Sequence, residues 1–322
     1  MLIQFARLGV FAAVLLGSCV VAAVGTRRLL QGTAMTRRGK AGFASALAFL
    51  AATLGCYLYG TLVEADSLEV TRTVISTPRL PRGAHYRIAH ISDLHVDVET
   101  PSLRQLRAAM QSAGADVLAF TGDAVNTNAG VEVFRSLLAG LPAPLGRFGV
   151  RGNHDAWYWK KVDLFGGVAT ELNTQHPVFL DGGKLAVCGS RYGKTWMLPQ
   201  CLAEARQSGA FTLLLNHTPD VFEELAPRAD LTLVGHTHGG QVRAPLYGAL
   251  ITMARSDKKY EMGRYDFPDG VLYVHRGIGF EPQAPRVRFL APPELTLIDV
   301  EGTGEPNAGD SAKSTLGEPP PN

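Results

Sequence analysis

Two long apolar stretches lie near the amino end, Leu8 to Gly25 and Phe43 to Ala65, and neither carries a charge in its central part. Each is about long enough to cross the roughly 30 Å apolar layer of a bilayer as a helix. The segment between them is basic, whereas acidic residues follow the second stretch. The positive-inside rule therefore predicts a cytoplasmic loop, with both termini and the rest of the chain facing outward. We predict a two-helix, multi-pass anchor in the inner membrane over residues 1–66.

The first stretch has a second interpretation. Arg7 precedes it, and "LGSC" at Cys19 is similar to the processing site of a lipoprotein, so a cleaved signal peptide is the alternative. The chain stays apolar through "VVAAVG" after that cysteine, which favours a retained helix.

Beyond the anchor, short apolar runs alternate with amphipathic helical patterns. Five of the runs have the length and composition of buried strands: Tyr86 to Ser92, Asp116 to Gly122, Gly146 to Gly152, Phe211 to His217 and Leu231 to His236. Helical patterns at 102–114 and 130–141 separate the early ones. Later runs, "PVFLD", "KLAVCGS", "VLYVHRG" and "LTLIDV", come with fewer helices and suggest a second sheet packed on the first. The pattern predicts a layered α/β domain over 85–300.

The flanks of that domain are poor in apolar residues. Residues 67–84 contain "TPRLPRG" and are predicted to be a linker. Residues 301–322 are rich in Gly, Pro, Ser and Glu, and a segment of this composition buries too little apolar surface to fold, so we expect a disordered tail.

Polar residues follow strand after strand, at the edge of an α/β sheet where ligands bind. Each has an ordinary explanation alone, such as a turn or a cap. Together they predict a metal site, formed by Asp93, His95, Asp123, Asn153, His154, His217, His236 and His238. Oxygen and imidazole ligands without thiolate suit Mn, Fe, Zn or Co. Even seven of these eight as ligands are too many for one tetrahedral ion, and seven fit two ions that share a carboxylate.

Five motifs carry a family resemblance: "SDLHVD", "TGDAVN", "RGNHD", "LNHTPD" and "GHTHGGQV". In this order they resemble the calcineurin-like metallophosphoesterases, and the closing segment "VLYVHRGIGFEPQAPRVRFLAPPELTLIDV" is similar to a membrane-associated bacterial phosphodiesterase branch. The resemblance implies a four-layer α-β-β-α sandwich. It implies that Asp93, His95 and His238 hold one metal, that Asn153, His217 and His236 hold the other, and that Asp123 bridges them.

The resemblance also implies a mechanism. A hydroxide between two divalent metal ions would attack a phosphodiester or pyrophosphate bond in line. His154 would donate to a phosphoryl oxygen or to the leaving group, and Asp155 would orient it. Related proteins of the branch suggest UDP-2,3-diacylglucosamine pyrophosphate hydrolysis in lipid A synthesis, which conflicts with the outward topology. A protein or monoester phosphatase and a non-catalytic metal-binding scaffold are further alternatives.

Substrate preference is the least determined property. The anchor favours a phosphate ester or lipid-linked substrate at the bilayer. Arg276, Arg286 and Arg288 are candidates to contact a second phosphate, and the run Trp157, Tyr158, Trp159 is interpreted either as a pocket wall or interface contact or as helix packing.

Charge and cysteine content add little. A net charge of +2 offers no concentrated basic surface for nucleic acid, which we do not expect as a partner. Cys188 and Cys201 are interpreted as two separate small apolar residues, with a disulfide as the alternative.

Overall fold

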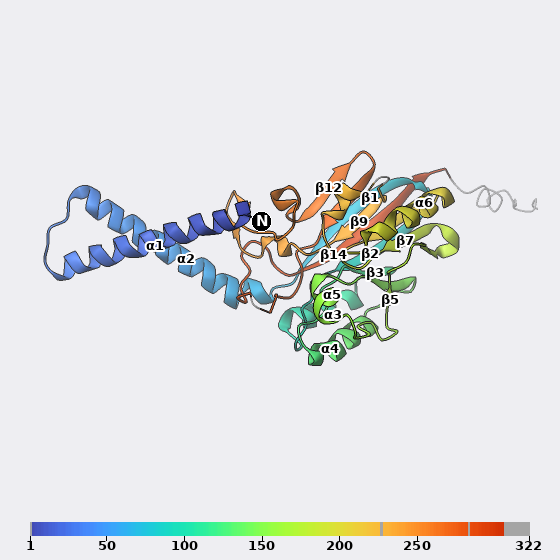
Figure 1. Ribbon diagram of the computed structural model, residues 1–322, viewed down its shortest axis with the longest axis horizontal. Helices are drawn as coiled ribbons and strands as arrows, with labels where there is room; N and C mark the ends of the chain where they lie inside the picture. Colours follow the sequence, from blue (N-terminus) through green and yellow to red (C-terminus); the bar gives the residue numbers. More distant parts are fainter. Residues whose placement is uncertain (1, 226–227, 283, 306–322) are drawn as a thin grey trace, which may run out of the picture.

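The structure is a computed structural model that describes residues 2–225, 228–282 and 284–305. A helical hairpin projects from a layered α/β body (Figure 1). Helices α1 (Leu2–Leu30) and α2 (Arg37–Leu62) form the hairpin, and the predicted apolar stretches lie within them or extend just beyond α2. Both helices are long and apolar enough to cross a bilayer.

Small residues allow the two helices to approach closely. A Cβ on Gly25 would lie 2.1 Å from the Phe43 ring, so only glycine leaves room for that ring. Ala22 and Ala46 are also buried, whereas large apolar side chains such as Leu16 and Leu54 are exposed along the hairpin. Small residues at the contact and large apolar ones outside are typical of helices that pack within lipid.

Two sheets of six strands each form the body within the described residues. The first sheet has the order β1 (Glu69–Pro81), β14 (Glu294–Gly304), β2 (His85–Ile91), β3 (Val117–Phe120), β4 (Gly146–Gly149) and β5 (Thr170–Glu171). The second has the order β12 (Gly263–Phe267), β13 (Gly270–Val274), β9 (Leu231–Val234), β8 (Phe211–Leu215), β7 (Leu185–Gly189) and β6 (Val178–Leu180). A short ladder joins β10 (Arg243–Ala244) and β11 (Gly248–Ala249).

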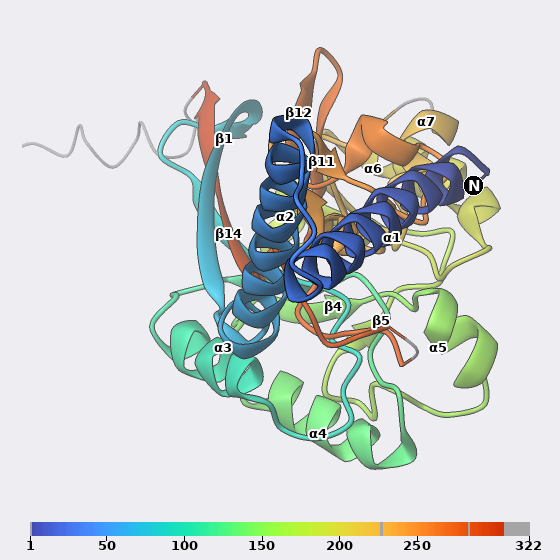
Figure 2. The same cartoon turned by 90° about the vertical axis from the view of Figure 1, so that its left-hand side faces the viewer.

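Helices cover the outer face of each sheet, which gives the predicted four layers (Figures 1 and 2). The first sheet packs on α3 (Pro101–Gln111) and α4 (Asn128–Ala139), and the second on α6 (Leu198–Ser208) and α7 (Val221–Glu224). Successive side chains of a strand point to opposite faces of the sheet, so each strand contributes to two core layers. Leu213 and Leu215 face the core between the sheets, whereas Leu214 faces the helices.

Strand β1 overturns the linker interpretation of residues 67–84. It pairs in parallel with β14 from Glu69 onward, and alternate residues such as Ile75 and Thr77 are buried. The segment is rich in β-branched residues, which suit a half-buried edge strand even where the composition is polar. Residues 301–304, predicted as tail, belong to β14 because they pair with the end of β1. The rest of the predicted tail, from residue 306, lies outside the described residues.

Two further expectations differ from the structure. "LTLIDV" lies in the first sheet, between β1 and β2, and the runs of β8 and β9 lie in the second. Strand partners depend on contacts between distant segments, which a local pattern does not reveal. Cys188 of β7 and Cys201 of α6 form a disulfide in the core between the second sheet and its covering helices, so they are not separate apolar residues.

Candidate metal centre

All the predicted ligands lie in turns at the carboxyl ends of strands. β2, β3 and β4 are parallel neighbours in the first sheet, and β8 and β9 are parallel neighbours in the second. Asp93 and His95 follow β2, Asp123 follows β3, and Asn153 begins α5 (Asn153–Tyr158) after β4. His217 follows β8, and His236 and His238 follow β9. The two sheets therefore bring their ligand-bearing edges together.

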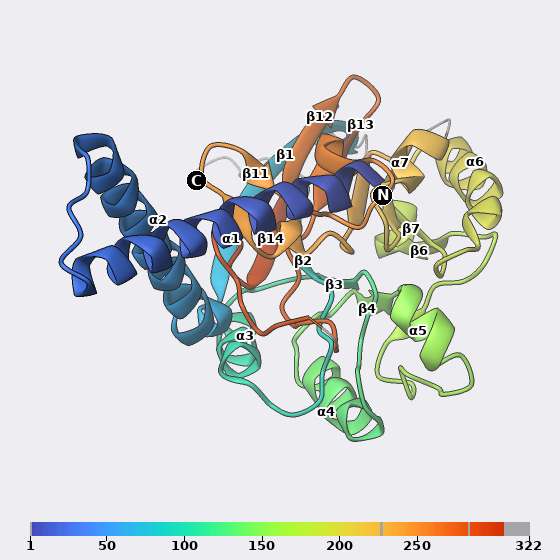
Figure 3. The same ribbon diagram turned by 60° about the vertical axis from the view of Figure 1, so that its left-hand side comes forward.

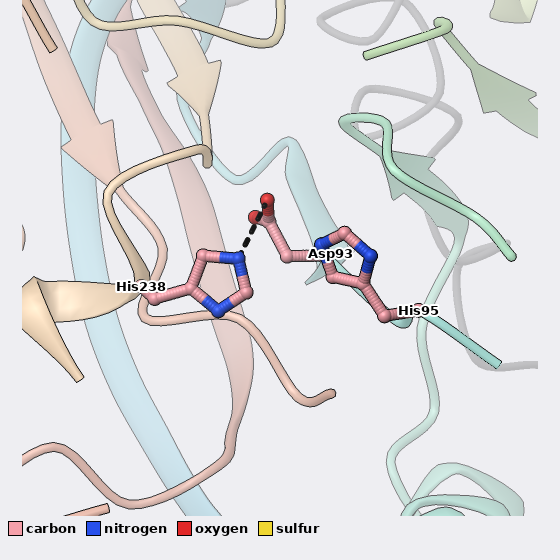
Figure 4. Close-up of side chains that lie close together, drawn as sticks. All are labelled: Asp93, His95 and His238. Carbon is pink, nitrogen blue, oxygen red and sulfur yellow. Dashed lines mark ion pairs between the residues drawn. The ribbon is translucent and has the colours of Figure 1, made fainter. Parts of the chain in front are cut away.

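One cluster joins Asp93, His95 and His238, whose candidate ligand atoms lie within 4.8 Å of one another (Figure 4). His238 Nε2 is 3.5 Å from Asp93 Oδ1. His95 Nδ1 is 2.9 Å from Asn126 Oδ1, so its Nε2 faces the cluster. Among the described residues, neither His95 Nε2 nor His238 Nε2 has a hydrogen-bond partner although both atoms are buried. Buried nitrogens without partners are costly unless a ligand such as a cation occupies them.

A second cluster surrounds His217. Its Nδ1 donates to the Thr121 carbonyl at 2.8 Å, which turns Nε2 toward the other side chains. That Nε2 lies 2.9 Å from Asn153 Oδ1 and 3.2 Å from His236 Nδ1. It is also 3.3 Å from Asp123 Oδ2. Three side chains from two sheets thus surround one imidazole nitrogen.

Asp123 lies between the clusters. Its Oδ2 is 3.7 Å from His95 Nε2 as well as near His217. Its Oδ1 accepts from the backbone N–H of His154 at 2.9 Å. The seven residues expected to hold metal therefore lie close together, and the ligand atoms of Asp93, Asp123 and His217 also lie within 4.8 Å of one another.

The backbone at the site is strained. Five of the seven residues have positive φ, a left-handed conformation that is rare for side chains other than glycine: Asp93 (49°), His95 (43°), Asp123 (58°), His236 (72°) and His238 (50°). Each such residue costs on the order of 1 kcal/mol or more, and such strain persists where function requires it. The strain turns side chains back toward the centre immediately after a strand ends.

Two glycines allow the turns to approach one another. A Cβ on Gly152 would lie 2.1 Å from Asp123 Oδ1, and a Cβ on Gly235 would lie 2.1 Å from Asp93 Oδ2. Any side chain at either position would displace a carboxylate of the site.

The titratable groups buried at the site have pKa values shifted in opposite directions. Burial raises the pKa of Asp93 to about 7. Burial also opposes ionisation of Asp123, but the charge of His217 outweighs it and lowers the pKa of that carboxyl. In turn, Asp123 overcomes burial and raises the pKa of His217 to about 10, whereas burial lowers that of His95 to about 4. A centre of this composition is one that bound cations would stabilise.

His154 and Asp155 lie in the first turn of helix α5. The His154 ring is 8% exposed and packs edge-on against His95 with 5.0 Å between centroids. Asp155 was expected to orient that ring. Its carboxylate instead accepts from the backbone N–H groups of Asp123, Ala124 and Gly152 at 2.8–2.9 Å. Within the described residues, Asp155 therefore supports the turn that carries Asp123.

The aromatic residues that follow the "GNHD" motif lie in two different environments. Trp157 and Tyr158 are 55% and 67% exposed and stand beside the His154 ring, whereas Trp159 packs on the core. Tyr192, which sequence analysis missed, links Trp157 to His217. Tyr192 follows β7, so the same carboxyl-end rule applied to "VCGSRY" would have found it.

The three candidate phosphate-binding arginines are engaged elsewhere. Arg288 is fully buried and donates to the carbonyls of Arg276, Ala291 and Gly279. Arg276 pairs with Glu69 and Glu294, and Arg286 pairs with Asp66. They hold the closing segment against β1, β14 and the end of α2, which corrects the phosphate-contact hypothesis.

Comparison with known proteins agrees with this geometry. A profile described as calcineurin-like phosphoesterase matches residues 86–240. An uncharacterized metallophosphoesterase, YkuE of Bacillus subtilis, is 31% identical over 77% of this chain and 91% of its own length. The UDP-2,3-diacylglucosamine pyrophosphatase LpxG of Chlamydia trachomatis is 27% identical over 79% of this chain and 96% of its own. The phosphodiesterase YaeI of Escherichia coli is 27% identical over 86% and 99%.

Proposed function

We propose that this chain, which belongs to the calcineurin-like phosphoesterase family of metal-dependent phosphoester hydrolases, cleaves a phosphodiester or pyrophosphate bond in a lipid-linked substrate at a membrane surface. The observation that carries the proposal is the convergence of imidazole, carboxylate and amide ligands from five strand ends, with His154 and exposed aromatics at its border.

The donor set suits two divalent ions. Asp93, His95 and His238 would hold one and Asn153, His217 and His236 the other, with Asp123 between them. The unpartnered His95 and His238 nitrogens support this assignment, as does the mixture of oxygen and nitrogen donors, which fits Mn, Fe, Zn or Co. Bound ions would lower the pKa of a water for attack on phosphorus and neutralise the phosphoryl oxygens.

The protein's own groups would complete the chemistry. The His154 ring, at the border of the site beside His95, would donate a proton to a phosphoryl oxygen or to the leaving group. Asp155 would keep Asp123 in place through the backbone of its turn.

Strand directions support a substrate at the membrane. β1 begins at Glu69, a few residues after α2 ends, and Thr71 and Thr73 pair with Thr296 and Ile298 of β14. β2 runs antiparallel to β14, so it runs back toward the hairpin and ends at Ile91, just before Asp93. The metal centre therefore lies at the hairpin end of the body, and a helix pair within a bilayer would hold that end near lipid head groups (Figure 3).

An outward-facing catalytic domain is the topology we favour for an anchor in the inner membrane at residues 1–66. The basic residues at the hairpin tip support it through the positive-inside rule. The bond between Cys188 and Cys201 supports it too, because disulfides persist mainly in oxidising compartments.

UDP-2,3-diacylglucosamine pyrophosphate hydrolysis is the second candidate, and the similarity to LpxG favours it. A nucleotide-linked substrate of the cytoplasm requires the opposite topology. The two candidates thus differ in the side of the membrane as well as in the bond that is cleaved.

A substrate panel tests the function. Full-length protein in detergent, loaded with Mn²⁺, would be given a phospholipid diester, UDP-2,3-diacylglucosamine, a generic phosphodiester and a generic monoester. We expect hydrolysis of a lipid-linked diester or pyrophosphate, and loss of at least about 100-fold in Asp123→Asn because each ion loses a shared ligand. Exclusive cleavage of the monoester would favour a monoester or protein phosphatase. No turnover with Mn²⁺, Fe²⁺, Zn²⁺ or Co²⁺ would favour a non-catalytic scaffold.

A further inference from the structure

The amino end of α1 is attached to the body, although the helix is apolar along most of its length (Figure 3). Gln4 is only 1% exposed. Its Nε2 donates to the Ala254 carbonyl at 2.9 Å, and its Oε1 accepts from the backbone N–H groups of Thr252 and Met253 at 3.0 and 3.1 Å. A buried amide with both ends satisfied by one loop is a specific contact, since each lost hydrogen bond would leave a buried polar group unpaired.

Arg7 extends the same contact. It lies one turn after Gln4, on the same face of the helix. Its Nη1 and Nη2 donate to the two carboxylate oxygens of Asp257 at 2.8 and 2.6 Å. Paired hydrogen bonds between guanidinium and carboxylate fix geometry as well as charge. Gln4 and Arg7 together hold residues 252–257, which we call the docking loop.

The docking loop contacts the metal centre through Met253. This residue has φ of 58°, a strained conformation that its N–H bond to Gln4 helps to hold. Its carbonyl lies 3.4 Å from His236 Nε2. His236 Nδ1 faces His217 Nε2 at 3.2 Å, within the second cluster. A carbonyl that accepts from Nε2 keeps the proton on that nitrogen and leaves Nδ1 free to bind a cation, which is a common way to orient a histidine ligand.

We propose that Gln4 is a positioning residue of the metal centre, which acts through the docking loop to orient His236. The first helix is then part of the catalytic unit and is retained in the mature protein, contrary to the signal-peptide alternative. The inference rests on the proposed assignment of His236 as a ligand, and its test below measures metal binding without any substrate.

The test uses full-length protein in detergent and three variants. Gln4→Ala removes the three hydrogen bonds that Gln4 makes with the docking loop and leaves the Arg7–Asp257 pair in place. Gln4→Glu keeps an oxygen for the Thr252 and Met253 N–H groups, but it replaces the donor to Ala254 with a second carboxylate oxygen that faces the carbonyl. Ser18→Ala is the matched control, because the Ser18 hydroxyl donates only to Val14 within the same helix. Mn²⁺ titration followed by electron paramagnetic resonance gives the affinity of each ion, and thermal unfolding of the metal-free protein gives stability.

We expect Gln4→Ala to weaken one of the two Mn²⁺ ions about 10-fold and to leave the other within about threefold, because contacts behind a ligand usually contribute on this scale. Gln4→Glu should recover part of that loss, because it keeps the acceptor for the two N–H groups, and Ser18→Ala should match the wild type. Mass spectrometry of the purified protein should find Gln4 still present.

Four results would overturn the proposal: unchanged affinity for both ions in Gln4→Ala, an equal loss at both ions that tracks a lower unfolding temperature, no recovery in Gln4→Glu, or a mature chain that lacks the first helix. Failure of the proposed function would look different. The wild type would then bind two ions and cleave none of the lipid-linked substrates. The Gln4 variants would still show whether the docking loop affects Mn²⁺ affinity through His236.

Discussion

At the scale of single residues, the proposed metal ligands are held in unfavourable backbone conformations. Asp93, Asp123 and His236 all have positive φ, and each is kept there by neighbours from another segment. Asp93 accepts from the His236 N–H with both of its oxygens, and Asp155 accepts from the Asp123 N–H. The ligands are therefore preorganised by hydrogen bonds between turns, which predicts separable effects for residues that hold metal, move protons or support a turn.

His154 is expected to move a proton without holding metal. His154→Ala should lower kcat by about 10²- to 10⁴-fold, the usual contribution of a general acid. Its content of bound Mn²⁺ should equal that of the wild type. Glu132→Gln, on exposed α4, is the control. Loss of metal together with activity would reassign His154 as a ligand, and full activity would remove it from the chemistry.

Asp155 is expected to support structure. Asp155→Ala leaves three buried backbone N–H groups without an acceptor. It should lower the free energy of unfolding by about 2–4 kcal/mol, measured by urea denaturation of the metal-free protein, because each unpaired buried donor is costly. Asp155→Asn keeps one oxygen and should lose less. If stability were unchanged and only kcat fell, Asp155 would instead orient His154, as the family resemblance implied.

At the scale of elements, the long pair β1 and β14 is the least obvious part of the fold. Its residues are half-polar, and its two strands lie at opposite ends of the domain sequence. β14 is held on its other side by β2, where Asp299 and Arg87 are register partners. The charge pair at this position offers a test of that arrangement that is remote from the metal centre.

Asp299 gives a pH-dependent prediction. Hydrogen bonds from Arg87 hold the pKa of the Asp299 carboxyl below its ordinary value, against a smaller effect of burial. A lowered folded-state pKa stabilises the protein above the unfolded pKa of about 3.9 and loses this effect as pH falls through the folded value. Asp299→Asn should therefore be about 1 kcal/mol less stable at pH 7, with the difference shrinking below about pH 4. A difference independent of pH would contradict the pairing.

The disulfide between β7 and α6 gives a second prediction at this scale. It links residues 13 apart in sequence. Replacing Cys188 and Cys201 together with serine should lower the free energy of unfolding by about 3 kcal/mol relative to oxidised protein, as expected for a loop of this size. Dithiothreitol should lower the unfolding temperature of the wild type and leave the double variant unchanged. Equal responses of the two proteins to the reductant would show that the bond does not form.

At the scale of the whole molecule, the helical hairpin and the sheet edge that carries the proposed ligands lie at the same end of the body. The direction of β1, which starts beside the hairpin, accounts for this arrangement. α2 is followed by one short 3-10 turn (Glu64–Asp66) and then by β1, and Arg288 donates its backbone N–H to the Gly60 carbonyl of α2. The closing segment therefore connects the hairpin to the turns around Asp93. In the proposed membrane arrangement, the side that the domain faces would determine which substrates the enzyme can meet.

Topology is tested by reporters fused after the carboxyl end of the full chain. We expect alkaline phosphatase fusions to be active and green fluorescent protein fusions to be dark, because the basic residues of the hairpin tip favour the cytoplasm. Reversing the charge of Arg27, Arg28, Arg37 and Arg38 should reduce that preference. A fluorescent, phosphatase-inactive pair would place the domain inside and favour the UDP-2,3-diacylglucosamine candidate.

The sequence by itself determined the layered α/β class, the two apolar helices and the ligand-bearing turns. These follow from local rules: apolar periodicity defines strands and helices, and polar residues that interrupt it at strand ends mark a binding edge. His95, Asp123 and His217 could be named in this way because each stands directly after a buried run or within a motif next to one.

Only the tertiary structure decided which segments meet. The pairing of β1 with β14, the disulfide, the backbone contacts of Asp155, the salt bridge of Arg276 with Glu294 and the contact from Gln4 to the docking loop all join residues distant in sequence. Such contacts depend on how the sheets and the hairpin pack in three dimensions. A local pattern of residue types does not contain that information, because the same polar residue can bind a phosphate, pair with an acid or cap a turn according to its distant neighbours.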